Sequence, residues 1–515
     1  MAVKPNVLLI TVDQFRGDCL SMLGHPVVRT PNLDRLGREG LIFTNHFCCS
    51  APCGPARTTL LTGLYPCNHR SVTNGTPLDR RHTNLALEAR RAGYAPILFG
   101  YTDTSIDPRG LSADDPRLRS YEGVLDGFDV GLGYRDQVPE GWLDHLRAVG
   151  CELPDRPYDT YLPAGHDPSN AQEFPLLAAR YRAEDSDNAW ITGRVIDHLR
   201  RRDGYPWFVH AVYLRPHPPL VAPAPYHTMY DPERMPTPPR GPSRQRDLSC
   251  HPYLASWFEI DENSSHRVMG FEPASLDDAD MRRMQAVYYG LVSEVDAQIG
   301  RLLDYLRETG QLDRTLVVFT SDHGELLGDH WQWAKGGFYD GSYHVPLIIR
   351  DPRYLGQPRI VSQPFTESID LMPTILQRLG IEPPETCDGR SLWPLTEGNT
   401  PDDWRPYTFW EFDFRSVDSG RAEAALGLRP DQCTLNVIRD RRYKYVHFTA
   451  LPPLLFDLSI DPDELTDVAQ RPEYLPVVAE YAQKLLSHRM LHADRTLTNY
   501  RLTPRGVAHY QGPRS

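Results

Sequence analysis

The sequence has no excess of positive charge. Its 515 residues include 55 lysines and arginines against 68 aspartates and glutamates, which gives a formal net charge of −13 at pH 7. Proteins that bind nucleic acids present a basic surface to the phosphates, so this balance argues against that class. If the protein acts on an anionic small molecule, positive charge must be concentrated in the pocket that binds it.

Long apolar segments are also absent. No stretch approaches the roughly 20 apolar residues that cross a bilayer, so we expect no membrane contact. The apolar run at residues 7–12 is too short for a secretory signal, and it ends in an acid, which is typical of a buried strand. We therefore expect a cytoplasmic protein.

Cysteine is scarce and irregularly spaced. The nine cysteines are an odd number, and no Cys-x-x-Cys pair of the zinc-binding kind stands out. We therefore expect no disulfide framework. Cys48, Cys49 and Cys53 lie close together in the sequence, and only Cys53 has a distinctive context of its own.

Apolar runs that are typical of strands alternate with helical patterns. Strands are expected at residues 6–12, 94–101, 207–214, 315–320 and 345–350. Helices are expected at about residues 31–36, 85–91 and 276–309. The longest of them has Ser275 as its expected N-cap and Gly310 as its stop. This alternation predicts an α/β sandwich with a large, mainly parallel sheet between helices.

The chain changes character twice along its length. Residues 215–242 are rich in proline and must form a loop or lid, because proline disrupts helices and central strands. An insertion is expected at about residues 230–275. Later apolar runs at 433–438 and 443–448 predict an antiparallel sheet, closed by a helix at 473–491. We expect a catalytic α/β domain at residues 1–384 and a smaller α+β domain at residues 385–515.

Polar side chains follow two of the expected strands. Asp13 and Gln14 come directly after the first strand, and Asp-His-Gly-Glu at residues 322–325 follows the strand at 315–320. Ligands of open α/β sheets bind beyond the carboxyl ends of the strands. Alone, Asp13 would more often be a strand-end acid that caps a turn, and an Asp-His pair is weak evidence, but together the two groups predict a divalent-metal site.

Cys53 precedes a helical pattern that begins near Pro55. The start of a helix has unpaired N–H groups and the positive end of the helix dipole, and both favour an anion. An unmodified thiol at such a place is a candidate low-pKa nucleophile. The alternative is a buried cysteine ahead of an ordinary helix.

The residues around Cys53 extend this pattern. Residues 53–63 read Cys-Gly-Pro-Ala-Arg-Thr-Thr-Leu-Leu-Thr-Gly, which resembles the maturation motif of the sulfatases in the alkaline phosphatase superfamily. Further segments resemble the phosphonate monoester hydrolase/arylsulfatase branch of that superfamily. These segments are Val-Asp-Gln at 12–14, Gly-Tyr-Thr at 100–102, Arg-Pro-His-Pro-Pro at 215–219, Asp-Gly-Arg-Ser-Leu at 388–392 and His-Ala-Asp-Arg-Thr-Leu-Thr at 492–498. The resemblance covers nearly the whole chain and implies an alkaline-phosphatase-like fold.

The resemblance implies a particular nucleophile. In this family a separate formylglycine-generating enzyme oxidises the motif cysteine, here Cys53, to formylglycine. The hydrated aldehyde then attacks the ester and forms a covalent hemiacetal intermediate. The implied substrates are small anionic esters, namely phosphonate monoesters, phosphate diesters and aryl sulfates, with promiscuity among them. The alternatives are a dedicated arylsulfatase, a metal phosphoesterase with unmodified Cys53, and a non-catalytic anion-binding protein.

The resemblance also implies a metal site. Asp13, Gln14, Asp322 and His323 match the ligand positions, and the diol derived from Cys53 completes the set. Sulfatases proper usually have a second aspartate and an asparagine where Gln14 and His323 stand. Fewer carboxylates and an imidazole favour Mn²⁺ over Ca²⁺, with Zn²⁺ as a further alternative.

Three basic residues match catalytic positions of the family. Arg57 would orient the nucleophile, while Lys335 and His217 would bind the substrate anion and assist the leaving group, His217 as a general acid if it is protonated. Without the resemblance, Lys335 would be interpreted as a solvated surface lysine. Without it, a polar residue held by its flanking prolines would be as good an interpretation of His217 as a catalytic residue.

Three further residues bear on the substrate. Asn74 and Tyr101 match positions that contact the transferred group. Asp103 departs from the threonine of phosphonate monoester hydrolases. Our hypothesis is that Asp103 acts as a base or selects a substrate with a cationic or hydrogen-bonding group. The equal alternative is that it caps a turn before Asp107.

The C-terminal segment at residues 501–515 contains proline and glycine and could not fold by itself. In the family that this chain resembles, C-terminal segments contribute to subunit contacts. We therefore expect a homodimer or homotetramer, and the alternative is a frayed terminus.

Overall fold

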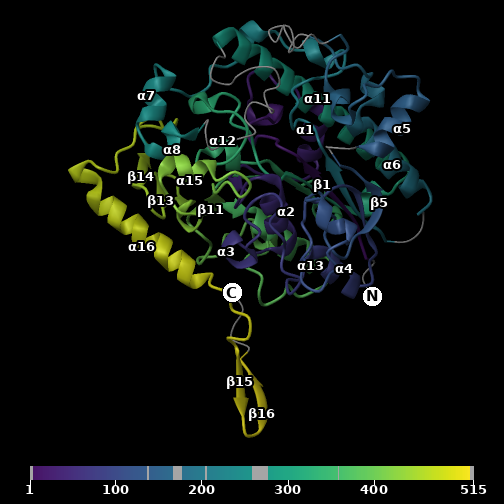
Figure 1. Cartoon of the computed structure of the whole chain (residues 1–515). Coiled ribbons are helices and arrows are strands. Elements are labelled where there is room, and N and C mark those ends of the chain that lie inside the picture. The colour runs from purple at the N-terminus through teal and green to yellow at the C-terminus, as the bar shows by residue number, and fades with distance from the viewer. Residues whose placement is uncertain are drawn as a thin grey trace.

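The computed structural model describes residues 4–135, 139–165, 177–202, 206–257, 277–357 and 359–510. These residues form one body, from which a hairpin near the C-terminus projects (Figure 1). No helix among the described residues is long and apolar enough to cross a membrane. All nine cysteines are free thiols.

The centre of the body is an eight-stranded sheet with the order β5-β4-β6-β1-β7-β8-β2-β9. All its neighbours are parallel except β8, which runs antiparallel to β7 and β2. Its strands are β1 (Asn6–Val12), β2 (Leu41–Phe43), β4 (Pro96–Gly100), β5 (Asp129–Gly133), β6 (Phe208–Tyr213), β7 (Thr315–Ser321), β8 (Leu347–Arg350) and β9 (Arg359–Val361). The five strands expected from the sequence are all confirmed. β1 is buried along its whole length because it lies in the middle, between β6 and β7.

The sheet lies between two groups of helices, which confirms the α/β sandwich. One group contains α1 (Pro31–Arg38), α6 (Asp187–Arg200) and α11 (Asp278–Glu308), and the other contains α2 (Cys53–Thr62), α4 (Leu85–Arg91) and α13 (Leu371–Arg378). Further helices are α3 (Pro66–His69), α5 (Glu140–Ala148), α12 (Asp340–Tyr343), α14 (Trp393–Thr396) and α15 (Arg421–Leu426).

The ends of α11 test the predicted cap and stop. Asp277 caps this helix by accepting a hydrogen bond from the backbone N–H of Asp280. Ser275, the cap expected from the sequence, lies outside the described residues. Gly310 has a φ of +65°, a conformation that glycine adopts readily, so it stops the helix as predicted.

The second sheet is antiparallel, as the sequence predicted. It has the order β11-β12-β13-β14 and packs beside α16 (Leu475–Leu491). Its strands are β11 (Thr408–Asp413), β12 (Thr434–Arg439), β13 (Tyr443–Phe448) and β14 (Leu454–Asp457). Two further pairs are β3 (His46–Phe47) with β10 (Thr366–Glu367), and the terminal hairpin β15 (Tyr500–Thr503) with β16 (Gly506–His509). A domain boundary at residue 385 stays a prediction.

The proline-rich segment is a loop, as predicted. Within residues 215–242 the only regular elements are two short 3-10 turns, Tyr226–Thr228 and Pro232–Arg234. The helices α7 (Arg244–Ser249) and α8 (Pro252–Ala255) follow it. The expected insertion at about 230–275 stays a prediction, because residues 258–276 lie outside the described part of the chain.

Candidate active site

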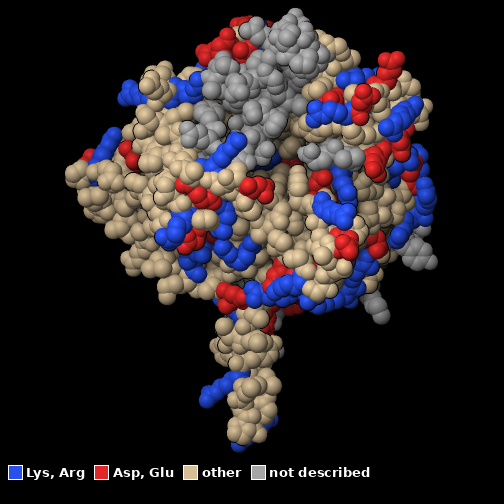
Figure 2. Space-filling model, viewed as in Figure 1, with Lys and Arg blue, Asp and Glu red and all other residues tan. Residues whose placement is uncertain are grey.

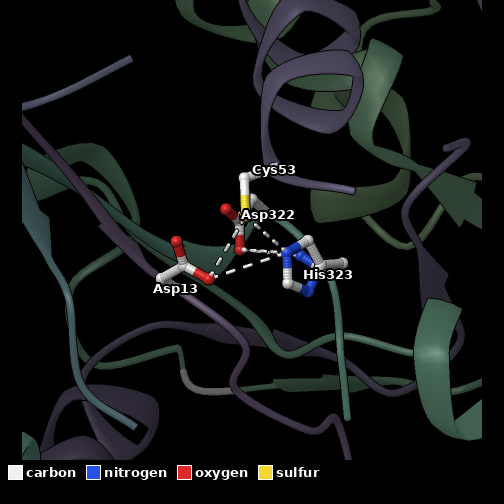
Figure 3. Close-up of side chains that lie close together, drawn as sticks. All are labelled: Asp13, Cys53, Asp322 and His323. Carbon is white, nitrogen blue, oxygen red and sulfur yellow. Dashed lines mark hydrogen bonds and ion pairs between the residues drawn. The ribbon is translucent and has the colours of Figure 1, made fainter. Parts of the chain in front are cut away.

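Four buried side chains from three elements meet beyond the carboxyl ends of β1 and β7. They are Asp13, Cys53, Asp322 and His323, whose candidate ligand atoms all lie within 4.8 Å of one another (Figure 3). Val12 pairs with Ser321 in the register of β1 and β7, so the residues that follow these strands are brought side by side. Cys53 joins them as the first residue of α2. The two strand-end groups predicted to share a metal therefore do meet.

His323 is oriented as a metal-ligating histidine usually is. Its Nδ1 donates to the carbonyl oxygen of Gly324 at 3.0 Å, which directs Nε2 toward the cluster. Nε2 lies 3.2 Å from the Sγ of Cys53 and 3.6 Å from an Oδ1 of Asp13. Burial, together with the nearby Lys335, lowers the pKa of His323 to about 3, so the ring is neutral and able to bind a cation.

Arg57 joins the two carboxylates from the side opposite the cluster. Its Nη2 lies 2.9 Å from the Oδ2 of Asp13, and its Nε lies 2.8 Å from the Oδ2 of Asp322. Each carboxylate thus keeps its Oδ1 on the side of the cluster. Arg57 is predicted to orient the nucleophile, and its contacts in the structure orient two expected metal ligands.

The two carboxylates differ in acidity. Burial by itself raises the pKa of the Asp13 carboxyl, but His217, Arg57 and Lys335 outweigh it and hold this pKa well below its usual range. Burial and the charge of Asp13 raise the pKa of Asp322 to about 6. Two buried carboxylates this close need further positive charge to be ionised together. The donor set of two carboxylates, an imidazole and a residue at Cys53 therefore fits a divalent transition-metal ion.

Gln14 lies beside this cluster in a left-handed conformation, with a φ of +67°. Its backbone N–H donates to the Oδ1 of Asp322 at 3.1 Å. Its side-chain oxygen accepts a hydrogen bond from the Nζ of Lys335 at 2.6 Å, and its amide group donates to Glu325. Its role as a metal ligand stays a prediction.

Lys335 is only 5% exposed, so its interpretation as a solvated surface lysine is wrong. It reaches the site because the loop after β7 folds back around Glu325. This carboxylate accepts hydrogen bonds from the backbone N–H groups of Leu327 at 2.9 Å and Ala334 at 2.6 Å. Glu325 was not among the predicted site residues, although its place in Asp-His-Gly-Glu was a usable signal.

Cys53 differs from the sequence-based expectation in two ways. α2 begins at Cys53 itself and not near Pro55. Burial and the Asp13 carboxylate raise the pKa of the Cys53 thiol well above its ordinary value. The prediction of a low-pKa thiol is therefore wrong, because desolvation and neighbouring negative charge outweigh the helix dipole.

Asn74 and Tyr101 lie beside the cluster. The side-chain oxygen of Asn74 accepts a hydrogen bond from the backbone N–H of Gly54 at 2.9 Å, next to Cys53. The hydroxyl of Tyr101 donates to the Oδ2 of Asp13 at 2.8 Å, and its ring lies 4.0 Å from the guanidinium of Arg57. Their contact with substrate stays a prediction.

Asp103 and His217 complete the surroundings of the cluster. Asp103 is buried, has a φ of +49°, and places its Oδ2 3.9 Å from the Nε of Arg57. The Nδ1 of His217 donates to the carbonyl oxygen of Pro218 at 2.7 Å, and His217 is one of the charges that lower the pKa of Asp13. The structure thus brings every predicted site residue to one place.

Comparisons with known proteins identify the family of this chain. The family model described as Sulfatase matches residues 5–381, and the model described as N-sulphoglucosamine sulphohydrolase, C-terminal, matches residues 328–490. The chain therefore belongs to the sulfatase family. Its fold, its site and its relatives together define a hydrolase of sulfate or phosphate esters.

Individual proteins of known name are similar to this chain over nearly its whole length. The multifunctional alkaline phosphatase superfamily protein PehA of Trinickia caryophylli is 47% identical, and the alignment covers 98% of this chain and 99% of that protein. An arylsulfatase of Clostridium perfringens is 30% identical over 94% of both chains. The solved phosphonate monoester hydrolase of Agrobacterium radiobacter superimposes with a TM-score of 0.94 at 46% identity, covering 99% of this chain and 100% of that chain.

Proposed function

We propose that the mature protein is a formylglycine-dependent, metal-assisted hydrolase of small anionic esters. The substrates are phosphonate monoesters, phosphate diesters and aryl sulfates, which share tetrahedral geometry. One observation carries the proposal. Cys53 begins a helix and lies within reach of Asp13, Asp322 and His323, while its thiol has a raised pKa and is poorly suited to act unmodified.

Asp13, Gln14, Asp322, His323 and the modified residue 53 would hold the metal ion. We propose Mn²⁺, because an imidazole and few carboxylates favour a transition ion over Ca²⁺, with Zn²⁺ as the alternative. A bound divalent ion supplies acidity to a coordinated hydroxyl and offsets the charge of the ester. Arg57 keeps both aspartates in place through its two ion pairs.

The chain's own residues then handle the substrate. Lys335 extends into the site beside Gln14, where its ammonium group can bind an oxygen of the transferred group. His217 has its Nδ1 proton on the carbonyl of Pro218, so Nε2 is the nitrogen that gains and releases a proton. We propose that His217 protonates the leaving oxygen, while Asn74 and Tyr101 line the path of the transferred group.

A dedicated arylsulfatase is the second candidate function. It is favoured if Asp103, at a position where phosphonate monoester hydrolases have threonine, replaces the base that related sulfatases supply from a histidine near this point. Relatives of both kinds are similar to this chain, a phosphonate monoester hydrolase at 46% identity and an arylsulfatase at 30% identity. A panel of phosphonate, phosphodiester and sulfate esters of one phenol separates the two candidates.

The first experiment is a mass spectrum of the tryptic peptide spanning residues 39–57. We expect a mass lowered by the difference between CH2SH and CHO, and capture of the peptide by an aldehyde reagent. The Cys53→Ala variant should bind metal but lack hydrolysis. Intact cysteine in an active preparation would instead support the metal phosphoesterase with unmodified Cys53.

Two partners belong to this proposal. A formylglycine-generating enzyme must act on Cys53, and because that thiol is buried in the folded chain, we propose that it acts before folding is complete. A second copy of the chain is the proposed partner of the terminal hairpin, giving a homodimer or homotetramer. The cytoplasmic location stays a prediction from the sequence.

A further inference from the structure

Arg215 is a buried arginine in the proline-rich loop, two residues before His217. Only 2% of it is exposed. Its Nη1 donates to the carbonyl oxygen of His217 at 2.7 Å and to that of Pro219 at 3.0 Å. One guanidinium therefore holds the backbone on both sides of Pro218, whose own carbonyl accepts from the imidazole of His217. These contacts fix both the backbone and the ring of His217.

The other side of Arg215 is anchored to α6. Its Nε lies 3.3 Å from the Oδ2 of Asp187, the first residue of that helix, which is completely buried. The hydroxyl of Tyr134 also donates to this oxygen, at 3.3 Å, and the guanidinium lies 4.6 Å from the centre of the Tyr161 ring. A carboxylate at a helix N-terminus is stabilised by the helix dipole, so Asp187 is a suitable ion-pair partner for Arg215, although the Nε of Arg215 makes no hydrogen bond to any described residue.

The start of α6 is in turn held by α11. The Glu294 side chain accepts hydrogen bonds from the Oγ of Ser186 and the Nδ2 of Asn188, both at 2.6 Å. Ser186 and Asn188 flank Asp187 in the chain. A continuous series of buried polar contacts thus leads from α11 through α6 to the loop that carries His217. None of these residues belongs to the catalytic cluster.

We propose that Arg215 is a positioning residue that holds His217 against the leaving oxygen, using the start of α6 as its anchor. The inference rests on the proposed role of His217 as general acid. Arginine suits this task because its planar group makes directed contacts on two sides at once, whereas a lysine ammonium is a compact charge on a flexible stem. A small displacement of the general acid His217 should lower the rate most for substrates whose leaving oxygen must be protonated.

The test compares Arg215→Lys, His217→Ala and the double variant on aryl esters with a good leaving group, 4-nitrophenolate, and a poor one, phenolate. For the phenyl ester we expect Arg215→Lys to lower kcat by about tenfold or more, since general acids contribute roughly 10²–10⁴-fold. With the 4-nitrophenyl ester the loss should stay within about threefold, because that oxygen needs little protonation. The double variant should be no slower than His217→Ala.

Arg350→Lys is the matched control. Arg350 is 3% exposed, pairs with Glu39 at 2.9 Å and donates to the carbonyl of Leu312 at 2.8 Å, at the end of β8. It should change thermal stability without changing the dependence on the leaving group. A second measurement is hydrogen exchange of the peptide that contains His217 and Val221, which we expect to be faster in Arg215→Lys and unchanged in Arg350→Lys.

Each contrary outcome has its own meaning. If the losses from Arg215→Lys and His217→Ala multiply in the double variant, or if exchange of the loop peptide is unchanged, the positioning role is wrong while the proposed function stands. If His217→Ala hydrolyses both esters at the wild-type rate, the role of His217 is wrong, and Arg215 cannot act through it.

Discussion

At the scale of single residues, neighbouring charges determine the pKa of each buried acid in the site. Arg57 makes ion pairs with Asp13 and Asp322 at less than 3 Å, yet the pKa of one carboxyl is lowered and that of the other is raised. Both carboxyls are desolvated, but His217 lowers the pKa of Asp13, whereas the charge of Asp13 raises the pKa of Asp322. The site is therefore poised to exchange a proton for a metal ion.

Metal affinity should accordingly depend on pH. The pKa of Asp322 is raised to about 6, so below pH 6 its carboxyl holds a proton that must leave before a cation binds. We expect the affinity of the metal-free protein for Mn²⁺ to rise by about tenfold per pH unit up to pH 6 and then to level off. His323, whose pKa is lowered to about 3, is neutral throughout this range.

Isothermal titration at several pH values between 5 and 7 measures this dependence. Asp322→Asn should bind Mn²⁺ weakly and with little change over the same range. An affinity of the unaltered chain that is constant from pH 5 to pH 7 would contradict the assignment of the exchanged proton to Asp322.

Asp103 provides a second test at this scale. Its carboxylate lies near Arg57 and adds to burial and the charge of Asp13 in raising the pKa of Cys53, so it contributes to the electrostatic field around residue 53. If Asp103 acts as a base or selects the substrate, Asp103→Asn should lower kcat by between about tenfold and a hundredfold, or change the order of preferred esters. Steady-state kinetics on the ester panel would show either effect.

Asp107→Asn is the matched control, because Asp107 pairs with Arg109 at the same loop. It should leave kcat and the substrate order unchanged. Our hypothesis for Asp103 would be abandoned if its own substitution had equally little effect.

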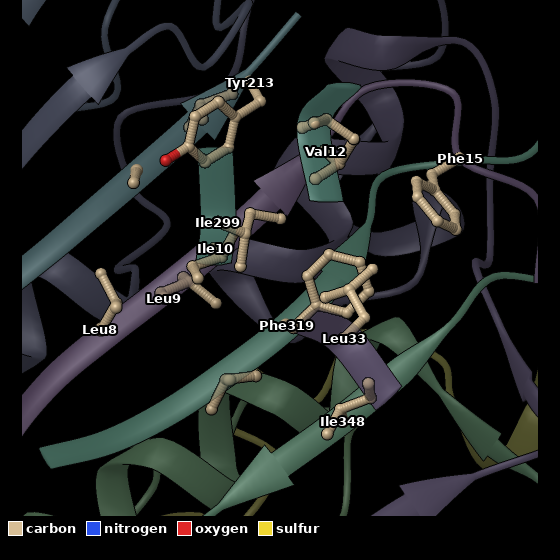
Figure 4. Close-up of a cluster of buried hydrophobic side chains, with 14 of the residues drawn as sticks. Leu8, Leu9, Ile10, Val12, Phe15, Leu33, Tyr213, Ile299, Phe319 and Ile348 are labelled. Carbon is tan, nitrogen blue, oxygen red and sulfur yellow. The ribbon is translucent and has the colours of Figure 1, made fainter. Parts of the chain in front are cut away.

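At the scale of elements, close packing holds the catalytic loops against the sheet. Side chains of β1, β7, β8, α1 and α11 form one apolar cluster, which includes Ile10, Leu33 and Phe319 (Figure 4). α11 also packs against the proline-rich loop. A Cβ built on Gly290 of α11 would lie only 2.3 Å from the carbonyl oxygen of Tyr226 in that loop. Because glycine has no Cβ, the helix and the loop can pack closely against each other at this position.

Gly290→Ala should therefore destabilise the protein. Overpacking of this kind costs about 1–3 kcal/mol, which exceeds the gain of about 0.5–1 kcal/mol from replacing a helical glycine with alanine. Gly193→Ala in α6 is the control, because its Cβ would meet only an atom of Arg301, at 3.5 Å. Denaturant unfolding should show a loss for Gly290→Ala and no loss for Gly193→Ala. Equal effects of the two substitutions would show that the loop moves to accommodate the added methyl group, and would contradict the predicted clash.

At the scale of the whole molecule, the terminal hairpin projects from the body and exposes apolar side chains. Leu502 is 83%, Val507 66% and Tyr510 70% exposed. The visible surface of the hairpin carries few charged side chains, in contrast to the body (Figure 2). A two-stranded hairpin is only marginally stable alone in water, so these apolar groups favour contact with another surface.

Our proposal of a homodimer or homotetramer is tested on this hairpin. Light scattering of the full chain should give the mass of two or four subunits. The double substitution Leu502→Asp and Val507→Asp should lower this mass. Ile460→Asp is the control, because Ile460 is also 70% exposed but lies outside the hairpin. A monomeric mass for the unaltered chain would refute the assembly.

Much of the architecture could be predicted from local patterns. The run of buried residues in β1 and the apolar pattern of β7 depend on short stretches of sequence, so their positions were predicted within a residue. The start of α2 was misplaced by two residues, because Pro55 is a common first-turn residue and hid the earlier start at Cys53. Such errors at element ends do not change which residues form the site.

By itself, the sequence determined the strands, the motif around Cys53 and the acids that follow two strands. Tertiary structure decided that β1 and β7 are neighbours, that Lys335 is buried beside Gln14, and that Arg57 joins both carboxylates. It also raised the pKa of Cys53, where the helix start had predicted the opposite. The physical reason is that strand pairing, desolvation and charge proximity depend on segments far apart in the chain, whereas periodicity and turn chemistry depend on adjacent residues.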